Sequence, residues 1–474
     1  MRYDVCIIGG GFGGLLCARQ LAKAGKSVLL LERQQQLGGC LQSYQRHGKQ
    51  YDTGFHYVGG LAEGQPLNVL FTELGLMDLP WHKLDAEGFD LVTIGSRTYH
   101  FREGYQHFVE GMSEYFPQEK NALKRYVEML QEAEQATFNQ EEALKMMEIN
   151  AYEYLSTLFK DPLLVNVLSG TALKTELRTD SLPLYSFAHT TGSYIQSSWR
   201  LKGDGNLIVN KLADDIKAMG GTILCRHEVV ELTEHEGKIA AVRCQNGEQY
   251  EASTFISDAH PAVTVDWMKE SHLLKGMYRR RMKSLENTFG IFTVSLELKP
   301  DVLPYFNHNK YVYKKPNVWT FYEDAGGTGG VMISCRVPED KQTYTQQVDL
   351  LTPMPWRMCE AWKDTTIGHR GDEYMNMKQR MAQECIQLAE TVIPGLGEMV
   401  TRQYTSTPLT YRDYTLTPEG SAYGVRKDCR SVMLTMLSPQ SPIPNLLFTG
   451  QNMMLHGLEG VAMTAMNTTR LLLK

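Results

Sequence analysis

Four residues that can give or take a proton lie within glycine-rich turns of this sequence. His56 and Tyr57 lie in one such turn, and His456 and Glu459 lie in another. Imidazole, phenol and carboxyl groups transfer protons well when a site tunes their pKa values. The alternatives are that His56 only contacts a bound ligand and that Glu459 only favours a helix start through its charge. No G-x-S-x-G or H-E-x-x-H motif occurs, so the pattern indicates proton transfer rather than hydrolysis.

The first glycine-rich turn, within residues 4–32, joins an apolar strand to a helix and a second apolar strand. Gly9, Gly11 and Gly14 give the G-x-G-x-x-G spacing that binds a pyrophosphate at a helix N-terminus. Gly9 permits the tight turn, Gly11 lets the backbone approach the ligand, and Gly14 lets the helix pack closely on the sheet. Glu32, which ends the second strand, is placed to hold ribose hydroxyls. The unit predicts a dinucleotide site, and the alternative is a glycine turn without a ligand.

Two further glycine turns follow, Gly38-Gly39-Cys40 and residues 51–60, where a nicotinamide-binding unit would continue with another strand and helix. This succession indicates a larger dinucleotide. It resembles the FAD-binding flavoenzymes of the amine oxidase and phytoene desaturase superfamily. Amine oxidases usually carry arginine at the position of Cys40. Gly-Gly-Cys, followed by Asp-Thr-Gly-Phe-His-Tyr, is most similar to the retinol saturase branch, or all-trans-retinol 13,14-reductase-like branch, of that superfamily, which also includes carotenoid isomerases.

The resemblance extends to a return segment near Val229 and to the last forty residues. There a strand within residues 441–452 leads into a glycine turn, and a helix begins near Gly457. A helix N-terminus aimed at the flavin pyrimidine ring would stabilise negative charge on it. The FAD contacts that the resemblance implies are Gly9, Gly11, Phe12, Gly13, Gly14, Glu32, Arg33, Gly38, Gly39, Cys40, Gly54, Phe55, His56, Val229, Gly450, Gln451, Leu458, Glu459, Gly460 and Val461.

We expect an α/β protein with two domains, since 474 residues exceed the size of a usual single core. A Rossmann-like FAD-binding domain of the amine oxidase (GR2) type is expected from residues 1–68, 200–265 and 404–474. An α+β substrate domain, with a mainly antiparallel sheet and a helical cap, is expected from residues 69–199 and 266–403. The strands predicted for its sheet are residues 291–298, 311–313, 318–322 and 331–337.

Helical periodicity dominates the sequence between the three N-terminal glycine-rich turns and the return segment near Val229. Residues 121–149 predict one long amphipathic helix, and residues 151–173 predict helix broken at Asp161-Pro162. These helices either cap an apolar substrate tunnel or form a helical subdomain with its own core. Three further residues, Tyr194, Tyr411 and Arg412, are candidates to line the substrate cavity, with core packing or surface pairing as the alternative for each.

The resemblance implies hydride transfer between flavin N5 and a substrate carbon, for which the protein positions the substrate, excludes water and manages a proton. We therefore predict an FAD-dependent oxidoreductase that reduces a C=C bond of an apolar conjugated isoprenoid or polyene. The alternatives are a carotenoid-type desaturase or cis-trans isomerase, an amine oxidase, and a prenyl-lipid binding protein without activity. No second dinucleotide fingerprint occurs, so NAD(P)H or another electron donor is expected to bind only transiently.

Composition limits the partners. The formal net charge of −6 gives no reason to expect nucleic acid as a partner. The nine cysteines form no C-x-x-C pair and no Cys/His cluster, so we expect no metal site and a reducing, cytoplasmic setting. The sequence carries no signal for an oligomeric state.

The relation to membranes depends on two observations. No apolar run reaches eighteen residues and no leader-like segment precedes the first strand, so neither a membrane span nor secretion is expected. The basic cluster Arg279-Arg280-Arg281, with Lys283, is either a solvated helix face or a contact for anionic lipid. Peripheral contact with a membrane surface therefore stays open.

Overall fold

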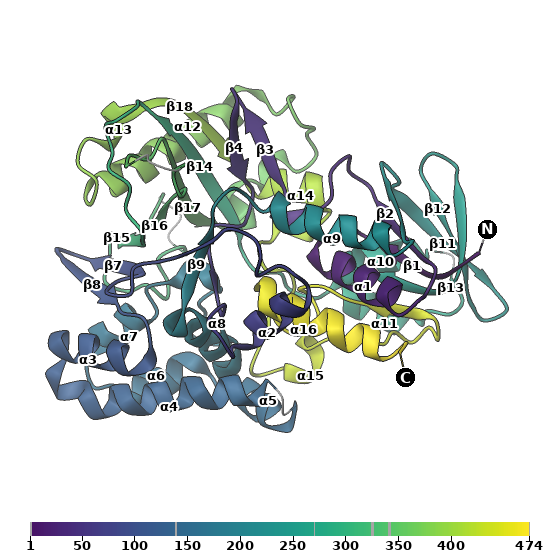
Figure 1. The fold of residues 1–474 in the computed structure, drawn as a ribbon, viewed down its shortest axis with the longest axis horizontal. Helices are drawn as coiled ribbons and strands as arrows, with labels where there is room; N and C mark the ends of the chain where they lie inside the picture. The colour runs from purple at the N-terminus through teal and green to yellow at the C-terminus, as the bar shows by residue number, and fades with distance from the viewer. Residues whose placement is uncertain (1, 138–139, 270, 324–326, 340–342, 474) are drawn as a thin grey trace.

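The computed structural model describes residues 2–137, 140–269, 271–323, 327–339 and 343–473. Two seven-stranded sheets dominate the described residues. In Figure 1 the first sheet lies on the right with both chain ends, and the second lies at the upper left. A group of helices, from α3 (Tyr105–Tyr115) to α7 (Pro162–Leu168), lies below the second sheet.

The first sheet has the strand order β10-β2-β1-β13-β12-β11, with β19 beside β13. Its strands are β1 (Arg2–Ile8), β2 (Val28–Glu32), β10 (Thr222–Cys225), β11 (Val229–His235), β12 (Lys238–Cys244), β13 (Gln249–Ser257) and β19 (Leu446–Phe448). The β1, β2, β10, β13 and β19 pairs are parallel. Helix α1 (Phe12–Lys23) connects β1 to β2 and packs against α9 (Asn206–Ala218) and α16 (Gly457–Arg470). This arrangement confirms the predicted strand-turn-helix-strand unit.

The second sheet has the strand order β18-β14-β17-β16-β15-β7-β8 and is antiparallel except between β15 and β7. Its strands are β7 (Asp90–Ile94), β8 (Arg97–Phe101), β14 (Gly290–Leu298), β15 (Asn309–Tyr313), β16 (Gly330–Cys335), β17 (Gln347–Met354) and β18 (Val400–Ser406). Helix α12 (Gly371–Glu390) packs on β15, β16 and β17. The mainly antiparallel sheet is therefore confirmed.

The strand predicted over residues 318–322 is wrong. The structure has bends and a turn there, and the side chains of Val318, Trp319 and Phe321 are buried in the core beside the helices. A buried loop and a buried strand are both short apolar runs, so hydrophobicity alone does not separate them.

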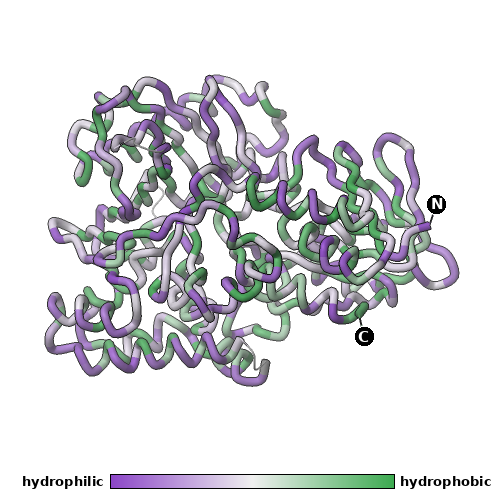
Figure 2. Tube along the Cα trace, viewed as in Figure 1, coloured by the Kyte–Doolittle hydropathy of each residue, from purple (hydrophilic) through white to green (hydrophobic). Residues whose placement is uncertain are grey.

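The helical region differs from prediction in one helix. Instead of one helix over residues 121–149, the structure has α4 (Lys120–Ala136) and α5 (Gln140–Met147), and residues 138–139 lie outside the described residues. Both helices are amphipathic, with polar and apolar residues interspersed along each (Figure 2), so their patterns resemble that of one helix. The predicted break at Asp161-Pro162 is confirmed, because Asp161 accepts the Leu163 N–H at 2.8 Å and caps α7.

The remaining elements connect these layers. A hairpin pairs β3 (Ser43–Arg46) with β4 (Lys49–Asp52), and a small sheet has the order β5 (Val58–Gly59), β9 (Ser198–Leu201), β6 (Trp81–Lys83). The other helices are α2 (Pro66–Glu73), α6 (Ala151–Leu158), α8 (Leu184–Gln196), α10 (Pro261–Asp266), α11 (Gly276–Lys283), α13 (Leu396–Met399), α14 (Pro408–Thr415) and α15 (Val432–Thr435). None of the helices in the described ranges is both long and apolar enough to cross a membrane.

The two-domain division stays a prediction. The first sheet takes its strands from residues 2–32, 222–257 and 446–448, and the second from residues 90–101, 290–354 and 400–406. Strand β18 therefore crosses the predicted boundary between residues 403 and 404.

Candidate active site

A cavity of about 380 Å³ is lined by residues from both large sheets. The three glycine-rich turns and the first turn of α16 form one part of its wall. Helix α8 and four adjacent strands of the second sheet form another part, to which Ile291, Tyr311, Met332 and Leu351 contribute. Tyr311 pairs with Met332, and Met332 with Leu351, so these side chains share one face of the sheet. The cavity thus joins a backbone-lined region to an apolar row.

The first glycine turn is closed by backbone contacts that exclude larger residues. Gly9 has φ +105°, and a Cβ on Gly14 would overlap the carbonyl oxygen of Gly9. Gly9, Gly11, Phe12 and Gly13 line the cavity, whereas Gly14 does not. Gly14 therefore serves the close approach of the helix to the turn, and the other glycines leave the backbone open to a ligand.

Glu32 lies at the end of β2 and lines the cavity as predicted. Its carboxylate accepts the Gly10 N–H at 2.8 Å and the Gln34 N–H at 2.7 Å. Burial raises the pKa of Glu32 above its usual range. Each oxygen still has a lone pair free for a ribose hydroxyl.

Asp258 is a residue at this turn that our sequence reasoning missed. A Cβ on Gly11 would lie 2.6 Å from its Oδ2, and a Cβ on Gly13 would lie 2.5 Å from its Oδ1. The carboxyl group lines the cavity, and burial raises the pKa of Asp258 to about 7. The available signal was topological: Asp258 follows β13, and the carboxyl ends of parallel strands meet at one edge of the sheet.

The second and third turns lie next to each other on the cavity wall. Gly38 and Gly39 have positive φ values of 116° and 56°, and a Cβ on Gly54 would lie 3.1 Å from the carbonyl oxygen of Cys40. Tyr411 lines the cavity and donates its hydroxyl to the Thr53 carbonyl at 2.6 Å. The predicted residues of these turns that line the cavity are Gly38, Gly39, Cys40, Gly54, Phe55, His56 and Tyr57.

Arg412 does not line the cavity. Its guanidinium donates to the Lys363 carbonyl at 2.7 Å and pairs with Asp413 at 3.0 Å. Arg33 does line the cavity, and it donates to the Asp413 carbonyl at 2.9 Å. Val229, at the start of β11, lines the same region.

The first turn of α16 faces the cavity, with Leu458, Glu459, Gly460 and Val461 in its lining together with Gly450 and Gln451. His456 precedes the helix, and its side chain does not cap it. Instead, His456 Nε2 lies 2.8 Å from the Lys174 carbonyl oxygen, and its ring packs 4.3 Å from that of Tyr423. Burial lowers the pKa of His456 to about 4, so a neutral imidazole donates to that carbonyl.

Two other predicted acid-base residues are partly buried beside a partner. Glu459 Oε1 lies 3.7 Å from Nε2 of His189 on α8, and burial raises the pKa of Glu459. His56 Nδ1 lies 3.8 Å from Asp349 Oδ2, and burial lowers the pKa of His56. His56 Nε2 has no hydrogen-bond partner among the described residues. His56 also borders a second, polar cavity of about 20 Å³, which is room for one water molecule.

Tyr57 belongs to a buried polar cluster that the sequence did not reveal. Its hydroxyl lies 2.9 Å from Asp90 Oδ2 and 2.6 Å from the Tyr311 hydroxyl. Lys174 Nζ lies 2.9 Å from the same Asp90 oxygen and 4.0 Å from the centre of the Tyr194 ring. Tyr57, Lys174, Tyr194 and Tyr311 line the cavity. No local motif marks Lys174 or Asp90, because they are 84 positions apart in the chain.

A glycine cradle at a helix N-terminus, an acid at the end of the second strand and a second helix N-terminus define a dinucleotide-dependent oxidoreductase of the flavin type. The described residues contain no cluster of three or more side chains suited to a metal ion. Residues 12–473 match the family of flavin-containing amine oxidoreductases. The chain belongs to this family, and FAD is its cofactor.

Individual relatives agree with this assignment. All-trans-retinol 13,14-reductases of Macaca fascicularis and Homo sapiens are each 26% identical to this chain, over 100% of it and 86% of their own length. Prolycopene isomerase 2 of an Oncidium hybrid cultivar is 23% identical over 89% of this chain and 75% of its own. An oxidoreductase from Methanosarcina mazei has the same fold, with a TM-score of 0.68 at 16% identity over 98% of this chain and 99% of its own.

Proposed function

We propose that this protein reduces a carbon–carbon double bond of an apolar conjugated isoprenoid. The observation that supports this most is the cavity, in which the apolar row of the second sheet meets the glycine turns and the first turn of α16. The relatives named retinol 13,14-reductase and prolycopene isomerase support a polyene substrate. Bound FAD supplies hydride chemistry. The apolar row orients the polyene and excludes water.

In this proposal the predicted FAD contacts divide by position. The turn from Gly9 to Gly13 holds the pyrophosphate with backbone N–H groups, and Glu32 holds the ribose. Val229 would contact the adenine, and the first turn of α16 would contact the pyrimidine ring. The cavity lining includes every residue predicted to contact FAD except Gly14.

The acid-base candidates take different roles. His56 and Tyr57 lie beside the ring-binding turn, and Glu459 begins the ring-facing helix. His456 is a positioning residue, since its Nε2 proton is donated to the Lys174 carbonyl. A proton for the substrate must therefore come from another group on the wall.

The test uses the purified holoprotein under anaerobic conditions. After the flavin is reduced with dithionite, retinoids or carotenoids are added and the oxidised flavin absorption is followed. A substrate restores that absorption in proportion to the double bonds reduced. If no polyene reoxidises the flavin, the proposal is wrong.

A second candidate is cis-trans isomerisation without net redox change, which the prolycopene isomerase relatives favour. It requires a polyene to change geometry while no reductant is consumed and the flavin spectrum stays constant. Release of ammonia or hydrogen peroxide from amines would instead indicate amine oxidation, and stable binding of a prenyl lipid without turnover would indicate an escort role.

We also propose peripheral contact with anionic membranes through the surface formed by α11 and α15. Arg281 joins these helices by donating to the Met433 and Leu434 carbonyls at 3.0 and 3.1 Å. Met277, Met433 and Leu434 are 76%, 79% and 54% exposed, and Lys275 and Arg280 are exposed near them. Exposed apolar side chains together with basic groups suit the boundary of an anionic bilayer.

A further inference from the structure

A buried ion pair borders the cavity on the side of Tyr57 and Tyr194. The side chain of Lys174 is 5% exposed and that of Asp90 is 0% exposed, and their charged atoms are 2.9 Å apart. Burying two charges costs several kcal/mol of desolvation per ion, so lysine and aspartate are almost never fully buried unless they are paired. Asp90 begins β7, and its parallel neighbour Asn309 donates to Asp90 Oδ1 at 2.9 Å. The carboxylate is thus fixed from two sides.

The hydrogen bonds of this cluster leave only one group with protons that are not donated to a neighbour. Asp90 Oδ2 accepts the Tyr57 hydroxyl proton and one Lys174 proton. Because Tyr57 gives its only proton to Asp90, the 2.6 Å contact requires Tyr311 to donate to the Tyr57 oxygen. Both phenol protons are therefore engaged. An ammonium group has three protons, and Asp90 is the only hydrogen-bond acceptor of Lys174 Nζ among the described residues.

We propose that Lys174 is the residue that delivers a proton to the substrate carbon, with Asp90 and the Tyr57–Tyr311 hydroxyl pair holding its ammonium group toward the cavity. This inference rests on the proposed reduction of a double bond. Lys174 Nζ lies 4.0 Å from the Tyr194 ring centre and 5.2 Å from the Tyr57 ring centre, so aromatic faces flank the charge. Burial also lowers the pKa of Lys174, which favours proton release.

The chain around Lys174 is anchored on both sides. Lys174 ends the short helix η3 (Ala172–Lys174), and its carbonyl accepts the His456 imidazole N–H immediately before α16. The preceding residue, Leu173, accepts the Tyr423 hydroxyl through its carbonyl oxygen. These contacts place the lysine relative to the helix that faces the flavin site.

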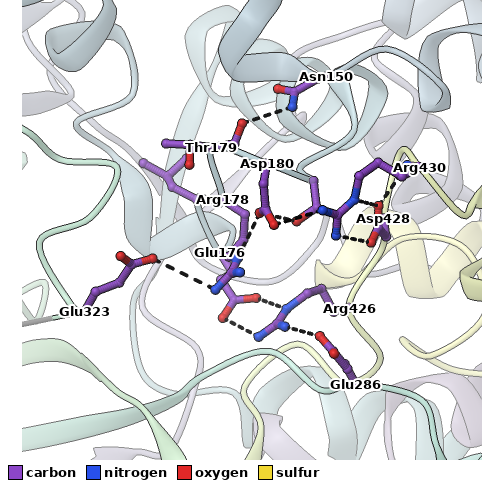
Figure 3. Close-up of polar contacts among 12 residues, drawn as sticks. Asn150, Glu176, Arg178, Thr179, Asp180, Glu286, Glu323, Arg426, Asp428 and Arg430 are labelled. Carbon is purple, nitrogen blue, oxygen red and sulfur yellow. Dashed lines mark hydrogen bonds and ion pairs between the residues drawn. The ribbon is translucent and has the colours of Figure 1, made fainter.

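Ion pairs fix the segment that follows Lys174 (Figure 3). Glu176 pairs with Arg426 at 2.6 Å, and Arg426 pairs with Glu286 at 2.5 Å. Further along, Asp180 pairs with Arg430 at 3.1 Å. A proton donor must be held near its acceptor atom, and this network removes the freedom of the loop that carries it.

The proposed step balances as follows. The double bond loses its π bond, one of its carbons gains hydride from reduced FAD, and the other gains a proton from Lys174 Nζ. The substrate is reduced by two electrons and the flavin is oxidised. Lys174 is left as a neutral amine, which takes a proton from water after product release.

The test separates the role of the Lys174 proton from the role of its positive charge. Lys174→Ala is expected to lower the rate of polyene reduction by about 100-fold or more, the usual range for a general acid. Added ethylammonium should restore the rate in a concentration-dependent manner. Tetramethylammonium carries the same charge without an N–H bond and should not. Restoration by both ions, or a Lys174→Ala rate equal to that of the wild type, would overturn the assignment.

A binding measurement that needs no turnover checks the position of the charge. The absorption band of a retinoid or carotenoid bound to the oxidised holoprotein should differ between wild type and Lys174→Met. Lys174→Arg keeps a cation that does not release its proton, so it should retain the band position yet lose reduction. The matched control is Lys310→Met. Lys310 is a half-buried lysine on β15 that does not line the cavity.

The outcomes separate the two proposals. If the wild type does not reduce any polyene, the proposed function fails. If the wild type is active and Lys174→Arg is equally active with an unchanged flavin spectrum, only the inference fails. Since Lys174→Ala leaves Asp90 unpaired and can impair folding, Lys174→Arg decides the matter in that case.

Discussion

In the proposed FAD site, Asp258 places a carboxyl group against Gly11 and Gly13, in the cradle that would receive the pyrophosphate. Burial raises the pKa of Asp258 to about 7, so the group is neutral below that pH and anionic above it. A nearby pyrophosphate raises that pKa further, and FAD binding therefore weakens as the pH rises above 7. We expect the FAD dissociation constant, measured by flavin fluorescence quenching, to rise up to about tenfold per pH unit there.

Asp258→Asn is the control for this effect. The amide is neutral at every pH and nearly the same size, so the dissociation constant of this variant should stay nearly flat between pH 6 and pH 9. Equal pH dependence in the variant and the wild type would contradict the explanation.

The Lys174–Asp90 pair makes a prediction about stability as well as chemistry. Lys174→Met leaves a buried carboxylate without its cation, which should lower the free energy of unfolding by about 3–5 kcal/mol. The double variant Lys174→Met/Asp90→Asn removes both charges and should recover most of this loss, because Asn can still bond to Tyr57 and Asn309. Urea unfolding of the three proteins measures the difference. No recovery in the double variant would mean that the two residues do not act as a pair.

At the scale of elements, the β1-α1-β2 unit depends on the close packing of α1 against the first glycine-rich turn. Gly14→Ala should abolish FAD binding, because the added Cβ would overlap the Gly9 carbonyl and push α1 away from the cradle. Gly25 follows the same helix with φ +78° and open space around it. Gly25→Ala should cost only about 1 kcal/mol of stability and keep the flavin spectrum. The flavin content of the purified variants measures both effects, and normal flavin content in Gly14→Ala would refute the packing argument.

These elements also show where sequence reasoning succeeds. The spacing of Gly9, Gly11 and Gly14 is a local pattern with a direct backbone cause, so it could be recognised before the fold was known. Strands β14, β15 and β16 of the second sheet follow from the apolar pattern for the same reason, whereas the other four strands of that sheet were not predicted.

The error in the helices and the omissions at the site have different origins. Periodicity predicts one helix where the structure has α4 and α5, because both helices are amphipathic. It also cannot show that Lys174 meets Asp90, or that Asp258 meets Gly13, since these pairs form only when separate segments assemble. Arg412 is the opposite case. It was a candidate for the cavity because it follows Tyr411, but its guanidinium donates to the Lys363 carbonyl instead.

At the scale of the whole molecule, the net charge of −6 opposes approach to an anionic membrane. Any contact must therefore depend on a local surface where basic and apolar groups coincide. The basic cluster predicted from sequence is only partly free to do this. Arg279 donates to the Val265 and Met268 carbonyls at 2.8 and 2.7 Å, Arg281 holds α15, and the exposed Lys283 pairs with Asp266, which leaves Arg280 exposed.

The surface formed by α11 and α15 should bind vesicles that contain phosphatidylserine and release them at high salt. Met277→Glu/Met433→Glu should weaken this binding at least about tenfold, because two apolar contacts are lost and two negative charges face the bilayer. Ile367→Glu alters an apolar residue that is 56% exposed outside this surface and should bind normally. Vesicle co-sedimentation measures all three proteins, and equal loss in both variants would show that binding depends on overall charge rather than on this surface.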